Sequence, residues 1–126
     1  MHLRVIIPIK VGAIAWSFVI KNKPIKLNVL TRFDKYAIDY AYKRGCRNYY
    51  CSFVSSSEDI KQIRNILPAG TKLISKVETS KSLNNIEEII LNSDSLLIDR
   101  GDLSREISIP LVPIAVDKVL TISKTY

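Results

Sequence analysis

Histidine, cysteine and glycine are scarce in this chain of 126 residues, which has one histidine, two cysteines and four glycines. The lone His2 gives no support to a zinc site or to Ser-His or Cys-His catalysis, because these need several such side chains. Cys46 and Cys51 match neither a CxxC redox pair nor a zinc spacing, so we expect reduced thiols in or near the core. No phosphate loop GxxxxGK[ST] occurs. Carboxylates and lysines must therefore carry any chemistry.

Long apolar runs are also lacking. The most apolar stretch, Val11 to Ile20, has ten residues, whereas a membrane span needs about 20. No small-x-small cleavage site follows it, so a secretory signal is not supported. We therefore expect a cytoplasmic protein with no membrane partner. Its apolar content of 47% is enough to build a core, but a whole (β/α)8 barrel needs about 250 residues.

Acidic residues are few in the first part of the chain. Residues 1–50 hold ten Lys and Arg against two Asp and Glu, and residues 51–126 hold nine against ten, so the net charge of +7 comes from the first part. This region suits an anionic partner or a solvated basic face. It lacks the basic-aromatic arrays of nucleic-acid-binding modules, so we expect no nucleic-acid partner. The aromatic residues at helical and strand spacing are expected to be packing residues. They are Trp16, Tyr36, Tyr40, Tyr42, Tyr49 and Tyr50.

From residue 30 onward, short β-type runs alternate with segments of helical period, which predicts successive βα units and a parallel sheet. Patterns typical of capping boxes, in which a hydroxyl and a later carboxylate satisfy unpaired amides, start the first two helices. The four expected helices run from Thr31 to Gly45, from Ser56 to Pro68, from about Ser82 to Leu91 and over residues 113–123. The three expected parallel strands are Asn48 to Val54, Lys72 to Val77 and Ser95 to Ile98.

The first thirty residues have a different pattern. Two strand-like runs, Leu3 to Ile9 and Ile14 to Ile20, are separated by Gly12. They predict a small β-hairpin appended to the αβ part, which we assign to residues 1–27.

The most informative charged residues lie at the ends of the second and third expected parallel strands. Side chains alternate along a strand, so Lys76 and Glu78 point to the same face. Asp102 follows the next strand, which brings it beside Glu78, while Gly101 lets a ligand approach the backbone closely. Two carboxylates suit Mg²⁺, which takes its remaining ligands from water and substrate. A surface salt bridge is the alternative interpretation of such a pair.

Two blocks of the chain, Ser75-Lys76-Val77-Glu78 and Arg100-Gly101-Asp102-Leu103, are similar to the Ser-Lys-Ile-Glu-Asn and Ala-Arg-Gly-Asp-Leu-Gly signature of the pyruvate kinase family. Leu30 to Asp34 resembles the family's Leu-Thr-Glu-Lys-Asp helix start, and Ser52-Phe53-Val54 resembles its Ser-Phe-Val strand. The resemblance runs in order over about residues 28–122. Agreement in several blocks is more specific than any one motif.

The resemblance implies a fold, an α/β half of a TIM-type (β/α)8 barrel with a short N-terminal β-hairpin. Residues 1–27 would resemble the end of the family's lid domain, and residues 28–126 would form about three βα units from the central part of the catalytic barrel. A half-barrel leaves strand edges and an apolar face uncovered, so we expect a homo-oligomer or a complementing chain. The potassium ligands and the nucleotide-positioning groups of the family are expected outside this chain.

The resemblance also implies roles in glycolytic transfer of a phosphoryl group from phosphoenolpyruvate to ADP, giving pyruvate and ATP. Lys76 would be catalytic, neutralising charge on the phosphoryl group and the developing enolate. Glu78 and Asp102 would hold Mg²⁺ or Mn²⁺. The backbone amides of Gly101 and Asp102 would bind the substrate carboxylate, and Arg100 would brace the loop. The chain by itself is expected to be inactive.

Several positions depart from the family pattern. They are Ser55, Thr79, Asp99, Ser104 and Asp117. Asp99 stands where the family has Ala, and an added carboxylate there would repel an anionic substrate unless it faced away. These departures keep a second hypothesis open, that the chain is a non-catalytic relic that binds a partner or an anion through its basic first fifty residues.

Overall fold

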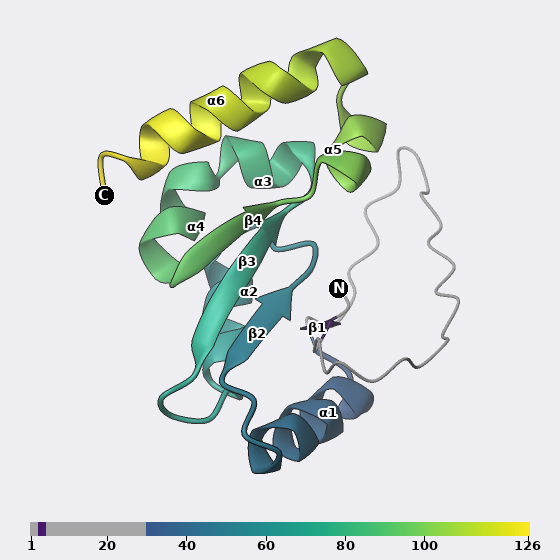
Figure 1. Cartoon of the computed structure of the whole chain (residues 1–126), viewed down its shortest axis with the longest axis vertical. Coiled ribbons are helices and arrows are strands. Elements are labelled where there is room, and N and C mark those ends of the chain that lie inside the picture. The colour runs from purple at the N-terminus through teal and green to yellow at the C-terminus, as the bar shows by residue number, and fades with distance from the viewer. Residues whose placement is uncertain (1–2, 5–29) are drawn as a thin grey trace.

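The computed structural model describes residues 3–4 and 30–126 (Figure 1). Both expected hairpin strands lie outside the described residues except for Leu3 and Arg4, and so does Trp16. The hairpin and its boundary at residue 27 therefore stay predictions.

Four strands form one sheet in the described part of the chain, in the order β1-β2-β3-β4. They are β1 (Leu3–Arg4), β2 (Asn48–Cys51), β3 (Lys72–Val77) and β4 (Ser95–Ile98). β1 pairs antiparallel with β2, whereas β2, β3 and β4 are parallel, as predicted. Tyr50 lies beside Ile74, and Lys76 lies beside Leu97. The carboxyl ends of the three parallel strands therefore meet at one edge of the sheet.

Six α-helices and one 3-10 helix occur among the described residues (Figure 1). They are α1 (Arg32–Lys43), α2 (Ser57–Arg64), α3 (Ser80–Asn84), α4 (Ile86–Asn92), α5 (Arg100–Glu106), the 3-10 helix η1 (Ile109–Leu111) and α6 (Val112–Ser123). None of the helices that the structure describes is long and apolar enough to cross a membrane. The chain is therefore an α/β protein with a three-stranded parallel sheet, and closure into part of a barrel stays a prediction.

The core lies on one face of the sheet. One cluster packs Tyr49 and Leu73 of the strands against side chains of α1, α2 and α4, and a second packs Val77 against α4 and α6. Burying one such side chain contributes about 1.5–3 kcal/mol. Because side chains alternate along β3, fixing Leu73 and Val77 beneath the helices turns Lys76 to the opposite face.

The helix starts predicted at Thr31 and Ser56 are confirmed. Thr31 Oγ1 accepts from the Asp34 amide at 3.2 Å, and the Asp34 carboxylate accepts from the Thr31 amide at 2.7 Å, which completes a capping box. Ser56 Oγ accepts from the Asp59 amide at 3.3 Å. The Asp59 carboxylate bonds the amide of Ser55 at 2.9 Å, one residue earlier than a capping box requires.

The single helix expected over Ser82–Leu91 is wrong, because α3 ends at Asn84 and α4 begins at Ile86. Asn85 between them has φ −105° and ψ 23°, away from helical values. Its side-chain amide donates to the carbonyl of Ser55 at 2.8 Å. Asparagine favours such breaks because its side chain competes with backbone hydrogen bonds.

The strand expected from Asn48 to Val54 is too long, since β2 ends at Cys51. Phe53 has φ +57°, in the left-handed region, which an extended strand does not contain. The backbone therefore turns directly after β2.

The expectation that the tyrosines are packing residues is confirmed for Tyr49 in the core, whereas Tyr36 and Tyr40 pack against each other on the surface. Tyr49 is 0% exposed, whereas Tyr36 is 71% and Tyr40 37% exposed. The rings of Tyr36 and Tyr40 stack with centroids 6.4 Å apart, and the Arg44 guanidinium lies 5.0 Å from the Tyr40 ring. α1 therefore presents an aromatic and basic surface.

Asp94 lies in the loop before β4 and bonds to both β3 and α2. Replacing it should therefore lower the free energy of unfolding. Its Oδ2 accepts from the Leu73 amide and from Arg64 Nη2, both at 2.6 Å. Burial alone would raise the pKa of Asp94, but the Leu73 amide and Arg64 outweigh it, and the pKa is lowered. We expect Asp94→Ala to reduce the free energy of unfolding by about 1 kcal/mol at neutral pH, measured by urea denaturation.

The sign of the shift fixes the pH dependence of this effect. A carboxylate with a lowered folded pKa stabilises above its unfolded pKa of about 3.9, and the stabilisation is lost as the pH falls through the folded value. The difference between Asp94→Ala and the parent should therefore shrink in acid. Asp39→Ala is the matched control, because Asp39 pairs with Lys43 at 2.7 Å on the exposed face of α1 and should contribute nothing measurable. Equal effects of the two substitutions would contradict the prediction.

Candidate active site

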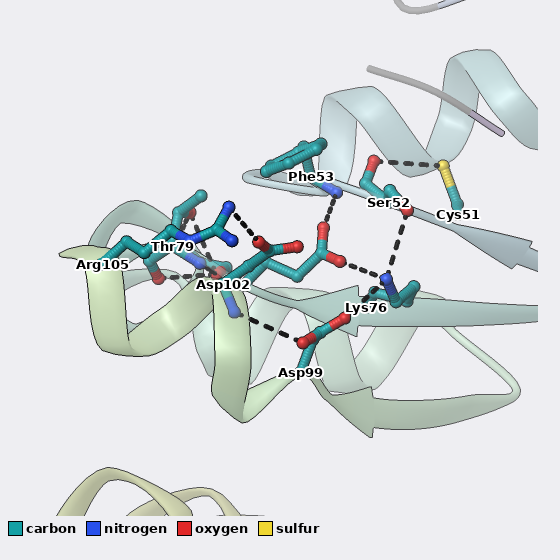
Figure 2. A network of polar contacts seen from close by, with 10 residues as sticks. Cys51, Ser52, Phe53, Lys76, Thr79, Asp99, Asp102 and Arg105 are labelled. Atoms are coloured by element: carbon teal, nitrogen blue, oxygen red, sulfur yellow. Dashed lines mark hydrogen bonds and ion pairs between the residues drawn. The ribbon is translucent and has the colours of Figure 1, made fainter. Parts of the chain in front are cut away.

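Polar side chains from the ends of all three parallel strands meet at the carboxyl edge of the sheet (Figure 2). Ser52 follows β2, Lys76 lies near the end of β3 with Glu78 directly after that strand, and Asp99 follows β4. Asp102 joins them from the first turn of α5. In parallel α/β folds this edge of the sheet is where ligands bind.

Lys76 and Glu78 form a buried ion pair at the centre of the site. Lys76 is 9% exposed and Glu78 is 1% exposed. The Lys76 ammonium donates to Glu78 Oε1 and, at 3.4 Å, to Ser52 Oγ. Glu78 Oε2 accepts from the amide of Phe53 at 2.6 Å. The hydrogen bond between Lys76 and Glu78 confirms the prediction that these two side chains share one face.

Asp99 makes the second ion pair of Lys76. Its Oδ2 lies 2.9 Å from Lys76 Nζ, and its Oδ1 accepts from the Asp102 amide at 3.4 Å as the N-cap of α5. Asp102 pairs with Arg105 of the same helix, with Oδ1 and Nη1 3.1 Å apart. Figure 2 shows Asp99 pointing toward Lys76 while its cap contact reaches α5.

The pKa values follow from burial and from these contacts. Burial raises the pKa of Glu78, and the hydrogen bonds from Lys76 and Phe53 offset this only in part. Burial also lowers the pKa of Lys76, but the bonds and charges of Glu78 and Asp99 together outweigh it, so the pKa is raised. The hydrogen bond from Lys76 holds the pKa of Asp99 below its usual value. At neutral pH, Lys76 is therefore a cation and Asp99 an anion.

Glu78, Asp99 and Asp102 each offer a carboxylate oxygen, and these oxygens lie within 4.8 Å of one another. Carboxylate oxygens are the ligands that Mg²⁺ and Mn²⁺ prefer, so the donor set fits such an ion. Among the described residues, the ammonium of Lys76 and the guanidinium of Arg105 lie against these carboxylates. The predicted proximity of Glu78 and Asp102 is confirmed, and their role as metal ligands stays a prediction.

Gly101 lies in the first turn of α5 and is exposed. A Cβ placed there would meet Asp99 Oδ1 at 3.5 Å, an ordinary contact. Packing among the described residues therefore gives no reason for a glycine. The close approach of a ligand to the backbone at Gly101 stays a prediction.

Asp99 belongs to this site, although the sequence marked it only as a departure from the family pattern. The structure fixes its position, because Val77 pairs with Ile98 and the amide of Asp99 continues the ladder to the Val77 carbonyl at 3.1 Å. The next residues along the two strands, Glu78 and Asp99, then fall on the same face. The sequence offered only the alternation of side chains along the expected strand, which places Asp99 on the same face as Leu97, and the register shows that this is also the face of Lys76.

The other departures near the site make local contacts. Thr79 caps α3, accepting from the Ser82 amide at 3.1 Å. Ser55 donates its hydroxyl to Asp59 at 2.8 Å, and the Ser104 hydroxyl donates to the Gly101 carbonyl at 2.8 Å. Within the described part of the chain, none of these three hydroxyls bonds to Lys76 or to the carboxylates that surround it, so Asp99 is the departure that changes the site.

Cysteine chemistry is disfavoured by the surroundings of Cys51. Its side chain is 0% exposed, and burial raises the pKa of the thiol to about 12. A thiolate, the reactive form, is therefore scarce at neutral pH. This agrees with the expectation of a reduced core thiol.

Taken together, the fold and the site define an α/β protein that gathers one ammonium and three carboxylates at the carboxyl edge of a parallel sheet. The chain belongs to the pyruvate kinase family, because its residues 14–125 match the family model for the pyruvate kinase barrel domain.

Individual pyruvate kinases are similar to the chain over most of its length. The protein from Methanocaldococcus jannaschii is 33% identical over 105 residues, which are 81% of this chain and 24% of that protein. The protein from Mycoplasma genitalium is 38% identical over 96 residues, 73% of this chain and 19% of that protein. The protein from Debaryomyces hansenii is 35% identical over 91 residues, 70% of this chain and 18% of that protein. The chain thus spans at most about a quarter of these relatives.

Removing the Lys76 charge should destabilise the fold. Lys76→Met leaves Glu78 and Asp99 without their shared cation, and breaking a buried pair in this way costs about 3 kcal/mol. The free energy of unfolding from urea denaturation measures the loss. Lys72→Met is the matched control, because Lys72 is exposed on the same strand. Similar stability of the two variants would show that the carboxylates do not depend on Lys76.

Proposed function

We propose that this chain carries the magnesium- and phosphoenolpyruvate-binding segment of a pyruvate kinase-type phosphotransferase. The proposed reaction moves a phosphoryl group from phosphoenolpyruvate to ADP and gives pyruvate and ATP, as a step of glycolysis in the cytoplasm. One observation carries the proposal. In a chain of this family, the ammonium of Lys76 and the carboxylates of Glu78 and Asp102 converge on the carboxyl edge of one parallel sheet.

The proposed roles follow from charge and position. Lys76 is kept cationic and lies against the acidic cluster, where it would neutralise charge on the phosphoryl group and on the enolate. Glu78 and Asp102 would hold Mg²⁺ or Mn²⁺ with their carboxylate oxygens. When bound, such an ion supplies Lewis-acid stabilisation of the substrate's oxygens. The amides of Gly101 and Asp102, in the first turn of α5, would orient the substrate carboxylate.

The remaining functions of a complete enzyme would come from outside the described site. The chain spans about a quarter or less of the length of these relatives, so other residues of a larger protein or assembly would position ADP and hold the potassium ion. We therefore expect no turnover from this chain alone.

Exposed apolar side chains support a partner that completes the fold. On η1 and α6, Ile109 is 74%, Ile114 64% and Leu120 50% exposed, and on α1 Phe33 is 84% exposed. Apolar side chains gathered on one element mark an interaction surface more often than scattered ones do. We propose that a second copy or a complementing chain covers them.

The alternative is a non-catalytic relic that binds a partner or an anion. The ion pair between Asp99 and Lys76 favours this second candidate, because it occupies the cation that phosphoryl transfer would use. Salt-sensitive binding to an anionic polymer that Glu78→Ala and Asp102→Ala leave unchanged would support it.

The proposed metal site is tested by binding of oxalate, a mimic of the enolate. We expect oxalate to bind in the presence of Mg²⁺ or Mn²⁺, with an affinity that falls about 100-fold or more in Glu78→Ala and Asp102→Ala, measured by calorimetry. Glu87→Ala, an exposed carboxylate on α4, is the matched control and should bind like the parent. Metal-independent binding, or binding that survives both site substitutions, would refute the metal role.

The proposed partner is tested by the mass in solution. A monomer has a mass of 14.3 kDa, and we expect light scattering to give a multiple of this value. Ile114→Glu should shift the mass toward the monomer, since a charge on an apolar contact disfavours association. Thr121→Glu places the same charge at another exposed position of α6 and should leave the mass unchanged. A monomeric parent chain would remove the case for self-association.

A further inference from the structure

The side chain of Asp99 is held between Lys76 and the start of α5. One oxygen lies 2.9 Å from Lys76 Nζ, and the other accepts from the Asp102 amide at 3.4 Å. Because both of its oxygens have a partner, the Asp99 carboxylate has little rotational freedom to leave the ammonium. Figure 2 shows Asp99 below Lys76, with one contact to Lys76 and one to the start of α5.

All three donors of the Lys76 ammonium have acceptors among the described residues. A lysine ammonium carries three N–H donors and no acceptor. Glu78 Oε1, Asp99 Oδ2 and, at 3.4 Å, Ser52 Oγ are the three acceptors. An incoming anion that binds Lys76 must therefore displace one of them.

Asp99 is the acceptor that an anion would have to displace. Glu78 has a side-chain exposure of 0% and is also tied to the Phe53 amide, and Ser52 is 5% exposed. The Asp99 side chain is 30% exposed, so it is the one that faces solvent. An anion arriving from solvent thus meets the negative charge of Asp99 before it reaches Lys76, and like charges at such distances repel.

We propose that Asp99 is a specificity-determining residue, an internal anion that competes with phosphoryl and carboxylate ligands for Lys76 and keeps the affinity of the site for them low. The proposal deepens the proposed function, because it rests on Lys76 as the group that binds the substrate's anionic part. Asp99 acts through Lys76 by an ordinary ion pair, and no covalent step is involved.

The test replaces the charge of Asp99 and keeps its shape and its cap. Asparagine is as good an N-cap as aspartate, so Asp99→Asn keeps the start of α5. The probe is inorganic phosphate in buffer without divalent metal, with binding followed by phosphorus NMR. We expect Asp99→Asn to bind phosphate about tenfold more tightly than the parent chain, the size expected for one partly exposed charge-assisted contact. The gain should disappear in the double variant Lys76→Met/Asp99→Asn.

Two controls separate the proposal from other effects. Asp39→Asn removes one negative charge from the exposed face of α1 and should leave phosphate affinity unchanged, which excludes an effect of net charge. Asp99→Ser, which also caps helices, repeats the test if the asparagine variant does not fold by circular dichroism. Unchanged or weaker phosphate binding in a folded variant would overturn the proposal, and so would a gain that persists without Lys76.

The phosphate experiment and the oxalate experiment can fail independently of each other. Failure of metal-dependent oxalate binding in the parent would count against the kinase-type site, while the metal-free phosphate comparison would still decide the role of Asp99. If Asp99 is instead needed as a metal ligand, Asp99→Asn will lose Mn²⁺ affinity, measured with the metal alone, and will show no gain for phosphate. That result would overturn the proposal.

Discussion

The buried ammonium of Lys76 is the constraint on which the rest of the site depends. It draws Glu78 and Asp99 from the ends of two neighbouring strands to one point, and Glu78 in turn holds the amide of Phe53 after a third strand. A charge removed from water must be matched by good contacts, because its desolvation costs several kcal/mol. The three strand ends are therefore held together by electrostatics at their edge as well as by the apolar core beneath them.

The sequence predicted the parts of this protein that depend on local chemistry. The hydroxyl-carboxylate cap at Thr31, the three parallel strands and the shared face of Lys76 and Glu78 all follow from rules that act over a few residues. The break at Asn85 and the turn at Phe53 did not follow, because each depends on a distant partner. Asn85 bonds the Ser55 carbonyl, 30 residues away in sequence, and Phe53 bonds Glu78, 25 residues away.

Asp99 shows how a family pattern and a structure complement each other. The pattern marked it as unusual, and repulsion of an anionic substrate was the concern, but the pattern gave no direction for the side chain. The register of β3 and β4 supplies the direction, and the contact with Lys76 shows that the added carboxylate pairs with the cation of the site. Family membership alone therefore does not describe the charge environment of Lys76, which Asp99 changes in this chain.

The left-handed backbone of Phe53 connects the carboxylate of Glu78 to the turn that follows β2. A phenylalanine with φ +57° is a strained conformation that persists only when its surroundings hold it, and here the holding bond comes from Glu78. Displacement of the Glu78 carboxylate would remove the hydrogen bond that holds this turn. Ser55, two residues later, bonds to Asp59 of α2 and to Asn85. The position of one carboxylate at the sheet edge is thereby tied, through the short segment from Phe53 to Ser55, to contacts of the helices behind the sheet.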